Sequence, residues 1–212
     1  LEEWYQHCPE KQISVLTNHD GINVTVSPDY VGSAEEAQKL ADKIMDNAGY
    51  STQLASGLTS QNVAVDGINT TLLEVFLRDQ NQWFVAHVLH LFAPGVPQVY
   101  YNDLLGQRND EERWHQTGEG REILRHNHPE HLLEHKFRQP FVQRVIRVMH
   151  FRSTYPAFEG HLDVISSPDH EVCLKWYKDD YVAYLHLDLY THLVDIQYYN
   201  VEEGRFEILD LT

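Results

Sequence analysis

Cysteine is scarce in this chain of 212 residues, which holds only Cys8 and Cys173. Two cysteines so far apart in the sequence indicate neither a disulfide framework nor a zinc knuckle. We interpret both as small buried apolar side chains, and we expect no metal site. Sparse cysteine also fits a reducing compartment, so the predicted location is the cytoplasm.

Positive charge is scarce as well, and long apolar runs are missing. Lys and Arg number 16 against 32 Asp and Glu, which leaves a formal net charge of −16. Such an acidic surface disfavours nucleic acid and anionic membranes as partners, whereas a neutral ligand rich in hydroxyls meets no repulsion. No apolar run approaches the ~20 residues that span a bilayer, and the first residues do not resemble a signal peptide.

The most informative stretch is SVLTNHDGI at residues 14–22. A short apolar run leads into the polar residues Asn18, His19 and Asp20 and breaks at Gly21. This pattern is typical of a buried parallel strand followed by a turn. In barrel enzymes of alternating strands and helices, polar residues at that end of a strand usually belong to the active site.

Hydrophobic periodicity and capping residues predict the other elements of residues 1–160. Ser33 and Glu36 have the form of a capping box, and the helix after it places Leu40, Ile44 and Met45 on one side. The predicted elements are a helix tail over Leu1–His7, strands over Ile13–Thr17 and Gln98–Tyr101, helices over Ala34–Asn47, Thr70–Arg78, Trp83–Phe92 and Pro140–His150, a loop over Gly49–Asn69 and a polar insertion over Leu104–His128.

After Pro156 the pattern changes to an alternation rich in β-branched and aromatic residues. Strands are predicted over Glu171–Tyr177, Tyr181–Asp188 and His192–Tyr199, with turns at 178–180 and 203–204. This part, from near His161 to the end, is therefore expected to form an antiparallel sheet.

The predicted fold class is α/β. Because two parallel strands cannot close a barrel, we interpret residues 1–160 as the C-terminal part of a (β/α)8 TIM barrel. They would hold strands seven and eight, with a long insertion at about 21–70 after strand seven. Residues 161–212 would form a separate antiparallel β domain.

Five sequence blocks carry a resemblance to a known family. They are NHDGI, LFAPGVPQVYY, LLGQRND, TGEGREILRH and FRSTYPAFEG, in that order. Their order and spacing resemble the sucrose phosphorylase subfamily of the α-amylase glycoside hydrolase superfamily, over nearly the whole chain to about Gly160. The resemblance implies a small carbohydrate substrate, no cofactor, and inorganic phosphate as a possible co-substrate.

The resemblance also implies roles for single residues. Asp20 would be the acid that stabilises the transition state, and His19 would bind the donor glucose beside it. Both would hydrogen-bond the hydroxyls at C2 and C3, and Arg121 would reach a more distant hydroxyl of the same sugar. Arg125 and Arg108 receive no such role, since either can pair with a neighbouring carboxylate.

The acceptor loop departs from the family pattern. Residues 60–69 read SQNVAVDGIN, where sucrose phosphorylases have Asn-Leu-Asp-Leu-Tyr-Gln-x-Asn. Asn62 and Asn69 match, but Ala64, Asp66 and Gly67 stand at the positions of the Asp, Tyr and Gln in this loop, which in the family contacts fructose and phosphate. A carboxylate at Asp66 raises the cost of binding an anion nearby, so Asn62, Asp66 and Gly67 are candidate determinants of the acceptor.

The family mechanism is a retaining double displacement with two further carboxyl groups, a nucleophile and an acid/base. By resemblance these belong to strands four and five, which would precede Leu1. We therefore expect the chain to act as the C-terminal portion of a glucosyl-transferring enzyme, phosphorylase or hydrolase, and to be inactive alone. Its expected partners are the missing N-terminal part or, through the open strand edges, a second copy as a homodimer.

Two other interpretations stay open at this point. The chain is alternatively a non-enzymatic piece that binds carbohydrate or serves in assembly. In the segment HNHPEHLLEH, His128, His131 and His135 recur with Glu134 at helical spacing and offer zinc ligands. Histidines on an exposed acidic helix are more often simply solvated, so the zinc interpretation is the weakest.

Overall fold

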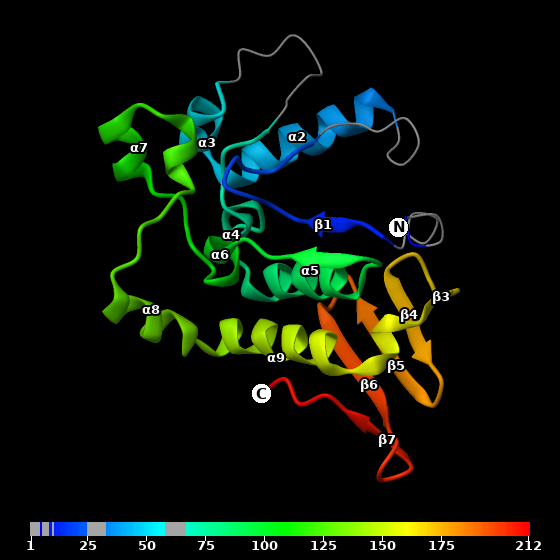
Figure 1. Ribbon diagram of the computed structural model, residues 1–212. Coiled ribbons are helices and arrows are strands. Elements are labelled where there is room, and N and C mark those ends of the chain that lie inside the picture. Colours follow the sequence, from blue (N-terminus) through cyan, green and yellow to red (C-terminus); the bar gives the residue numbers. More distant parts are fainter. Residues whose placement is uncertain (1–4, 6–8, 10, 25–32, 58–66) are drawn as a thin grey trace. The chain divides into compact units, whose positions relative to one another are not determined.

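The computed structural model describes residues 5, 9, 11–24, 33–57 and 67–212 (Figure 1). The expected helix tail at Leu1–His7, Cys8, and the acceptor-loop residues Asn62, Ala64 and Asp66 lie outside the described residues, apart from Tyr5.

The chain divides into two compact units with interleaved segments. Unit 1 comprises Leu1–Ser14, Phe84–Pro97 and Gln143–Thr212, and unit 2 comprises Val15–Trp83 and Gln98–Val142. The boundary predicted between residues 160 and 161 stays a prediction.

Helices dominate the chain up to residue 160, and strands follow it. The elements are β1 (Ile13–Val15), α2 (Ala34–Ala48), α3 (Tyr50–Ala55), α4 (Leu72–Val75), α5 (Gln80–Phe92), β2 (Val96–Gln98), α6 (Tyr101–Leu104), α7 (Glu111–Thr117), the 3-10 helix η1 (Gly120–Ile123), α8 (Glu130–Phe137), α9 (Pro140–Thr154), the 3-10 helix η2 (Pro156–Glu159), β3 (His161–Ile165), β4 (Glu171–Lys178), β5 (Tyr181–Asp188), β6 (Leu193–Asn200) and β7 (Arg205–Ile208). Among these described helices, none is long and apolar enough to cross a bilayer.

Unit 1 contains the predicted antiparallel sheet, with five strands in the order β3-β4-β5-β6-β7. Side chains alternate across it, so Val172, Leu174 and Trp176 of β4 are buried while their neighbours are half-buried. The indole nitrogen of Trp176 donates to the carbonyl of Phe92 in α5 at 2.9 Å. The C-terminal antiparallel sheet of the prediction is confirmed.

Strands β1 and β2 form a second, two-stranded sheet, and Figure 1 shows them running in the same direction. The Val96 N–H donates to the Gln12 carbonyl at 2.8 Å. The second strand was predicted over Gln98–Tyr101, which is wrong by about two residues. Gly95 explains the shift: its φ is +90°, and a Cβ there would lie 2.3 Å from the Gln12 oxygen, so pairing begins directly after it.

Helix α2 begins as predicted. The Ser33 side chain accepts from the Glu36 N–H, and the Glu36 carboxylate accepts from the Ser33 N–H at 2.6 Å, which completes a capping box. Ile44 and Met45 are buried, whereas Leu40 is half exposed. The buried stripe also includes Ala37 and Ala41, and Leu40 lies at its edge.

Part of the predicted loop Gly49–Asn69 is helical. Helix α3 follows α2 directly, with Gly49 ending one helix and beginning the next. The Thr52 hydroxyl bonds back to the Ala48 carbonyl at 3.3 Å and accepts from the Asn109 amide at 2.8 Å. Tertiary contacts of a buried threonine therefore outweigh the loop-like composition.

Asp103 in α6 is a buried carboxyl group of unit 2. Its Oδ1 accepts from the Leu72 N–H at the start of α4 at 3.1 Å. Its Oδ2 is buried and has no hydrogen-bond partner among the residues that the structure describes. Burial raises the pKa of Asp103 to about 7, although the bond from Leu72 opposes the shift.

The raised pKa of Asp103 predicts a pH-dependent stability. The folded state binds the proton more tightly than the unfolded state, so the free energy of unfolding falls as pH rises from about 4 to about 7. The expected loss is up to about 4 kcal/mol. Asp103→Asn keeps the acceptor for Leu72 and should remove this component, as measured by urea unfolding across the pH range. The exposed Asp42→Asn is the matched control, and an unchanged slope in Asp103→Asn would contradict the prediction.

Candidate functional site

The site begins at the tight turn that follows β1. Asn18 and Gly21 exchange two backbone hydrogen bonds, at 3.2 and 3.0 Å. The Asn18 side chain also accepts from the Asp20 N–H at 2.7 Å, which is an Asx turn. Gly21 has a φ of +99°, and a Cβ at this position would lie 2.2 Å from the Ile68 carbonyl oxygen. Only glycine fits here, and the turn fixes the position of Asp20.

The residues after the turn are anchored in the core of unit 2. Ile22 and Ile68 exchange backbone hydrogen bonds at 2.9 and 2.8 Å. Ile68 is fully buried and belongs to a cluster with Ile44 and Met45 of α2. Gly67 lies beside the turn, because a Cβ there would be 3.2 Å from the Asp20 carbonyl oxygen. The described end of the acceptor loop therefore contacts the backbone of Asp20 itself.

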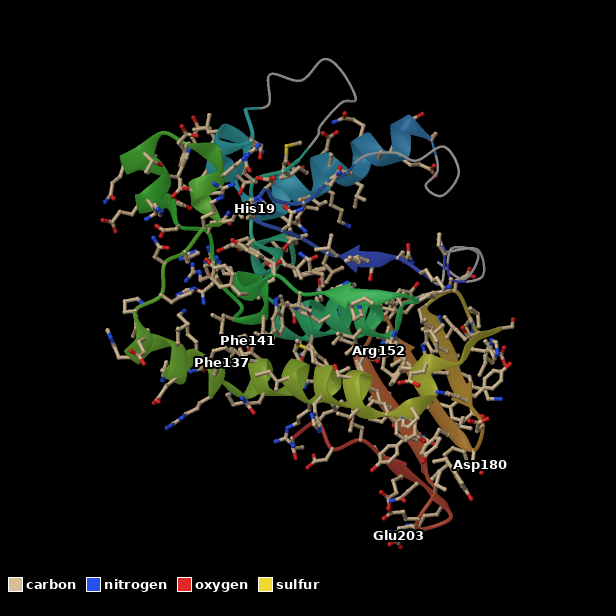
Figure 2. All side chains as sticks on the ribbon, in the orientation of Figure 1. His19, Phe137, Phe141, Arg152, Asp180 and Glu203 are labelled. Atoms are coloured by element: carbon tan, nitrogen blue, oxygen red, sulfur yellow. The ribbon has the colours of Figure 1, made fainter. Side chains whose placement is uncertain are left out.

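The Asp20 carboxylate is held by two arginines. Its Oδ1 lies 3.1 Å from Nη1 of Arg121 and 3.0 Å from Nη2 of Arg125. Nε of Arg125 donates to the His19 carbonyl at 2.9 Å, so this guanidinium binds the turn at two points. The His19 ring lies beside the other carboxylate oxygen, with Nε2 3.4 Å from Oδ2, and Figure 2 labels its position.

The two arginines come from η1 and the residues just after it. Ile123 and Leu124 are buried against Ala55 of α3. A Cβ at Gly120 would lie 2.0 Å from the Ala55 carbonyl oxygen, so η1 packs against α3 without room for a side chain. This packing positions the segment that carries Arg121 and Arg125.

The three charged side chains of the Asp20 cluster are partly exposed. The side chain of Asp20 is 44% exposed, that of Arg121 59% and that of Arg125 32%. Ion pairs this exposed contribute only about 0.2–1 kcal/mol each to stability. The convergence of these charges therefore adds little to the stability of the fold.

Residues near the site shape its loops. Asn109 accepts from the Thr71 N–H at 2.9 Å, and Asp110 accepts from the Arg113 N–H at 2.9 Å at the start of α7. Arg108 lies 3.5 Å from the buried Glu74 and takes no part in the Asp20 cluster.

The structure brings together Asp20, His19 and Arg121, with Gly67 beside them, and leaves Asn62 and Asp66 outside its described residues. Sequence reasoning gave Arg125 no role. Its partner Asp20 lies 105 positions away in the sequence, so local spacing offered no signal for it.

Comparison with known proteins gives relatives over nearly the whole chain, although no family model matches. Glucosylglycerol phosphorylase of Marinobacter adhaerens is 33% identical over 99% of this chain and 44% of its own length. Sucrose 6(F)-phosphate phosphorylase of Thermoanaerobacterium thermosaccharolyticum is 33% identical over 94% of this chain and 41% of its own length.

Solved structures agree with these relatives. The crystal structure of sucrose 6F-phosphate phosphorylase from Thermoanaerobacter thermosaccharolyticum matches with a TM-score of 0.87 and 32% identity, over 97% of this chain and 41% of that one. The chain thus spans less than half the length of the relatives it matches. On these matches, and on the residues around Asp20 that carry the resemblance, the chain belongs to the sucrose phosphorylase-like subfamily of the α-amylase superfamily.

Proposed function

We propose that this chain supplies the donor-glucose side of an enzyme that transfers a glucosyl unit from an α-glucoside. The observation that carries the proposal is the Asp20 carboxylate, fixed by the turn after β1 and clamped by Arg121 and Arg125. Both guanidiniums lie on Oδ1, so Oδ2 and the exposed His19 ring stay accessible to sugar hydroxyls. A charged acceptor at this position gains strength as the sugar approaches an oxocarbenium-like transition state.

The chemistry is a retaining double displacement through a glucosyl-enzyme intermediate. Asp20 and His19 bind the hydroxyls at C2 and C3, and the half-exposed Arg121 reaches a further hydroxyl of the same glucose. The nucleophile and the acid/base come from polypeptide outside these 212 residues. We therefore expect the 212 residues alone to be inactive and to act with the preceding part of the same enzyme.

The acceptor side decides between phosphorolysis and hydrolysis, and inorganic phosphate is the proposed co-substrate. The relatives named above act on different glucosides, so family membership leaves the leaving group open. Residues 60–69 differ from the sucrose phosphorylase pattern at Ala64, Asp66 and Gly67, which favours a leaving group other than fructose.

A substrate screen of the polypeptide encoded by the whole gene tests the proposal. The substrates are sucrose, sucrose 6'-phosphate, glucosylglycerate and glucosylglycerol, each with and without phosphate. Release of glucose 1-phosphate from one of them supports a phosphorylase, and release of glucose alone supports a hydrolase. Sugar binding with no turnover of any substrate would favour the non-enzymatic alternative.

The first prediction concerns the charge of Asp20. In the whole-gene enzyme, Asp20→Asn should cost roughly 3–5 kcal/mol of transition-state stabilisation, because an amide replaces the charged acceptor. The measurement is kcat/KM with the best donor. The exposed Asp42→Asn on α2 is the control and should keep full activity. A kcat/KM within a few-fold of wild type for Asp20→Asn would contradict the role.

The second prediction distinguishes the role of Arg125 from that of Arg121. Arg125 binds both the Asp20 carboxylate and the His19 carbonyl, so Arg125→Gln should let the turn move. The expected loss is about 1.5–3 kcal/mol, the range for hydrogen bonds to charged groups, and it should appear mainly in kcat. Arg121→Gln should instead raise the donor KM. The exposed Arg138→Gln, directly after α8, is the control, and identical effects of both variants on kcat and KM would refute this division.

The third prediction concerns Asp66. Asp66→Asn removes a negative charge without changing the size of the side chain, so it should lower the KM for phosphate. Turnover of the glucosyl donor with a neutral acceptor should stay unchanged. A substitution at Gly67 is less clean, because a new Cβ would press on the Asp20 carbonyl. An unchanged phosphate KM in Asp66→Asn would place the acceptor determinants elsewhere.

A further inference from the structure

Three side chains of types that bind metal ions lie close together on the C-terminal sheet of unit 1. Cys173 of β4 lies directly opposite His186 of β5 in the antiparallel register. Glu171 is two residues before Cys173 and therefore points to the same face. One ligand atom from each of the three residues lies within 4.8 Å of the other two, and His186 Nε2 is 3.1 Å from Glu171 Oε2.

The strands that carry this cluster are fixed by the core on their other face. Val172 and Leu174 of β4 and Leu185 and Leu187 of β5 are buried, with exposed fractions of 8% or less. All three cluster residues are half-buried. Glu171 and Cys173 also line a cavity of about 180 Å³.

We propose that Glu171, Cys173 and His186 bind a zinc ion. A thiolate, an imidazole and a carboxylate are the ligand types that zinc takes, with bonds of about 2.0–2.3 Å. Ligands around a tetrahedral centre then lie roughly 3.3–3.8 Å apart, so small rotations of the side chains close the site. Water completes the fourth position, since the cluster is half-exposed.

The charges balance in this site. Zn²⁺ binds one thiolate and one carboxylate, and the thiol proton passes to solvent on binding. The neutral imidazole completes the set without adding charge. An ion held between β4 and β5 binds only the folded sheet, so it should stabilise unit 1 and take no part in glucosyl transfer.

The histidine-rich segment around α8 is a weaker candidate. His128 Nε2 contacts the Asn102 side chain at 2.7 Å, and His135 Nε2 contacts the Gln139 amide at 2.9 Å. Each of these contacts occupies one of the two nitrogens of its ring. The segment also offers no sulfur ligand, which gives the experiment a way to tell the two places apart.

Cobalt(II) substitution tests the proposal. The purified 212-residue protein, or the enzyme from the whole gene, is freed of metal with a chelator and titrated with cobalt(II) under reducing conditions. We expect the sulfur-to-cobalt charge-transfer absorption to appear and to saturate at one equivalent, and zinc to abolish it. Zinc should also raise the melting temperature of the wild type.

The variants assign the ligands. Cys173→Ser and His186→Gln should lose the charge-transfer band and the zinc-dependent rise in melting temperature. Cys8→Ser, with Cys173 kept, and His161→Gln on the same sheet are the matched controls and should keep both. A folded wild type without the band, or a band that persists in Cys173→Ser, overturns the proposal. If Cys173→Ser does not fold, the proposal is tested by the cobalt(II) titration of the wild type and by loss of the band in Cys173→Ala.

Discussion

The close approach of Gly21 to the Ile68 carbonyl is the constraint on which the candidate site depends. No side chain fits between these two backbones, so the turn after β1 packs directly against Ile68, a fully buried residue of unit 2. This turn fixes the position of Asp20, and the Asp20 carboxylate pairs with the two arginines. A second approach of the same kind, between Gly120 and Ala55, holds the segment that carries those arginines. Two glycines without room for a Cβ therefore set the geometry of a cluster that is itself largely exposed.

Within that cluster, one carboxylate has two separate tasks. Oδ1 lies beside both guanidiniums and is part of the scaffold, whereas Oδ2 lies 3.4 Å from Nε2 of the His19 ring. The chain carries a net charge of −16, so positive groups near a bound anion must be supplied locally. Arg121 and Arg125 are two such local positive groups, and both lie on the Asp20 carboxylate.

Local patterns in the sequence predicted the parts of the fold that local interactions decide. The capping box at Ser33 and the alternation in β4 and β5 depend on residues near one another in the chain, and both are found. Helix α3 was missed because the buried contacts of Thr52 with Asn109 join residues far apart in sequence. The role of Arg125 was missed for a similar reason, since its partner Asp20 lies 105 residues away. The Glu171, Cys173 and His186 cluster follows from strand register, and the spacing of cysteines along the chain does not reveal it.

The order of strands has a consequence for folding kinetics. Every strand of the C-terminal sheet pairs with its neighbour in the sequence, so each hairpin closes a short loop. Strands β1 and β2 instead join residues more than eighty positions apart, as in the bond from Val96 to Gln12. Contacts between residues close in the sequence form faster, so the C-terminal sheet should form before β1 pairs with β2. The turn that carries Asp20 directly follows β1. The surroundings of Asp20 should therefore form late in folding. A partly folded molecule would already contain the C-terminal sheet before the cluster around Asp20 is complete.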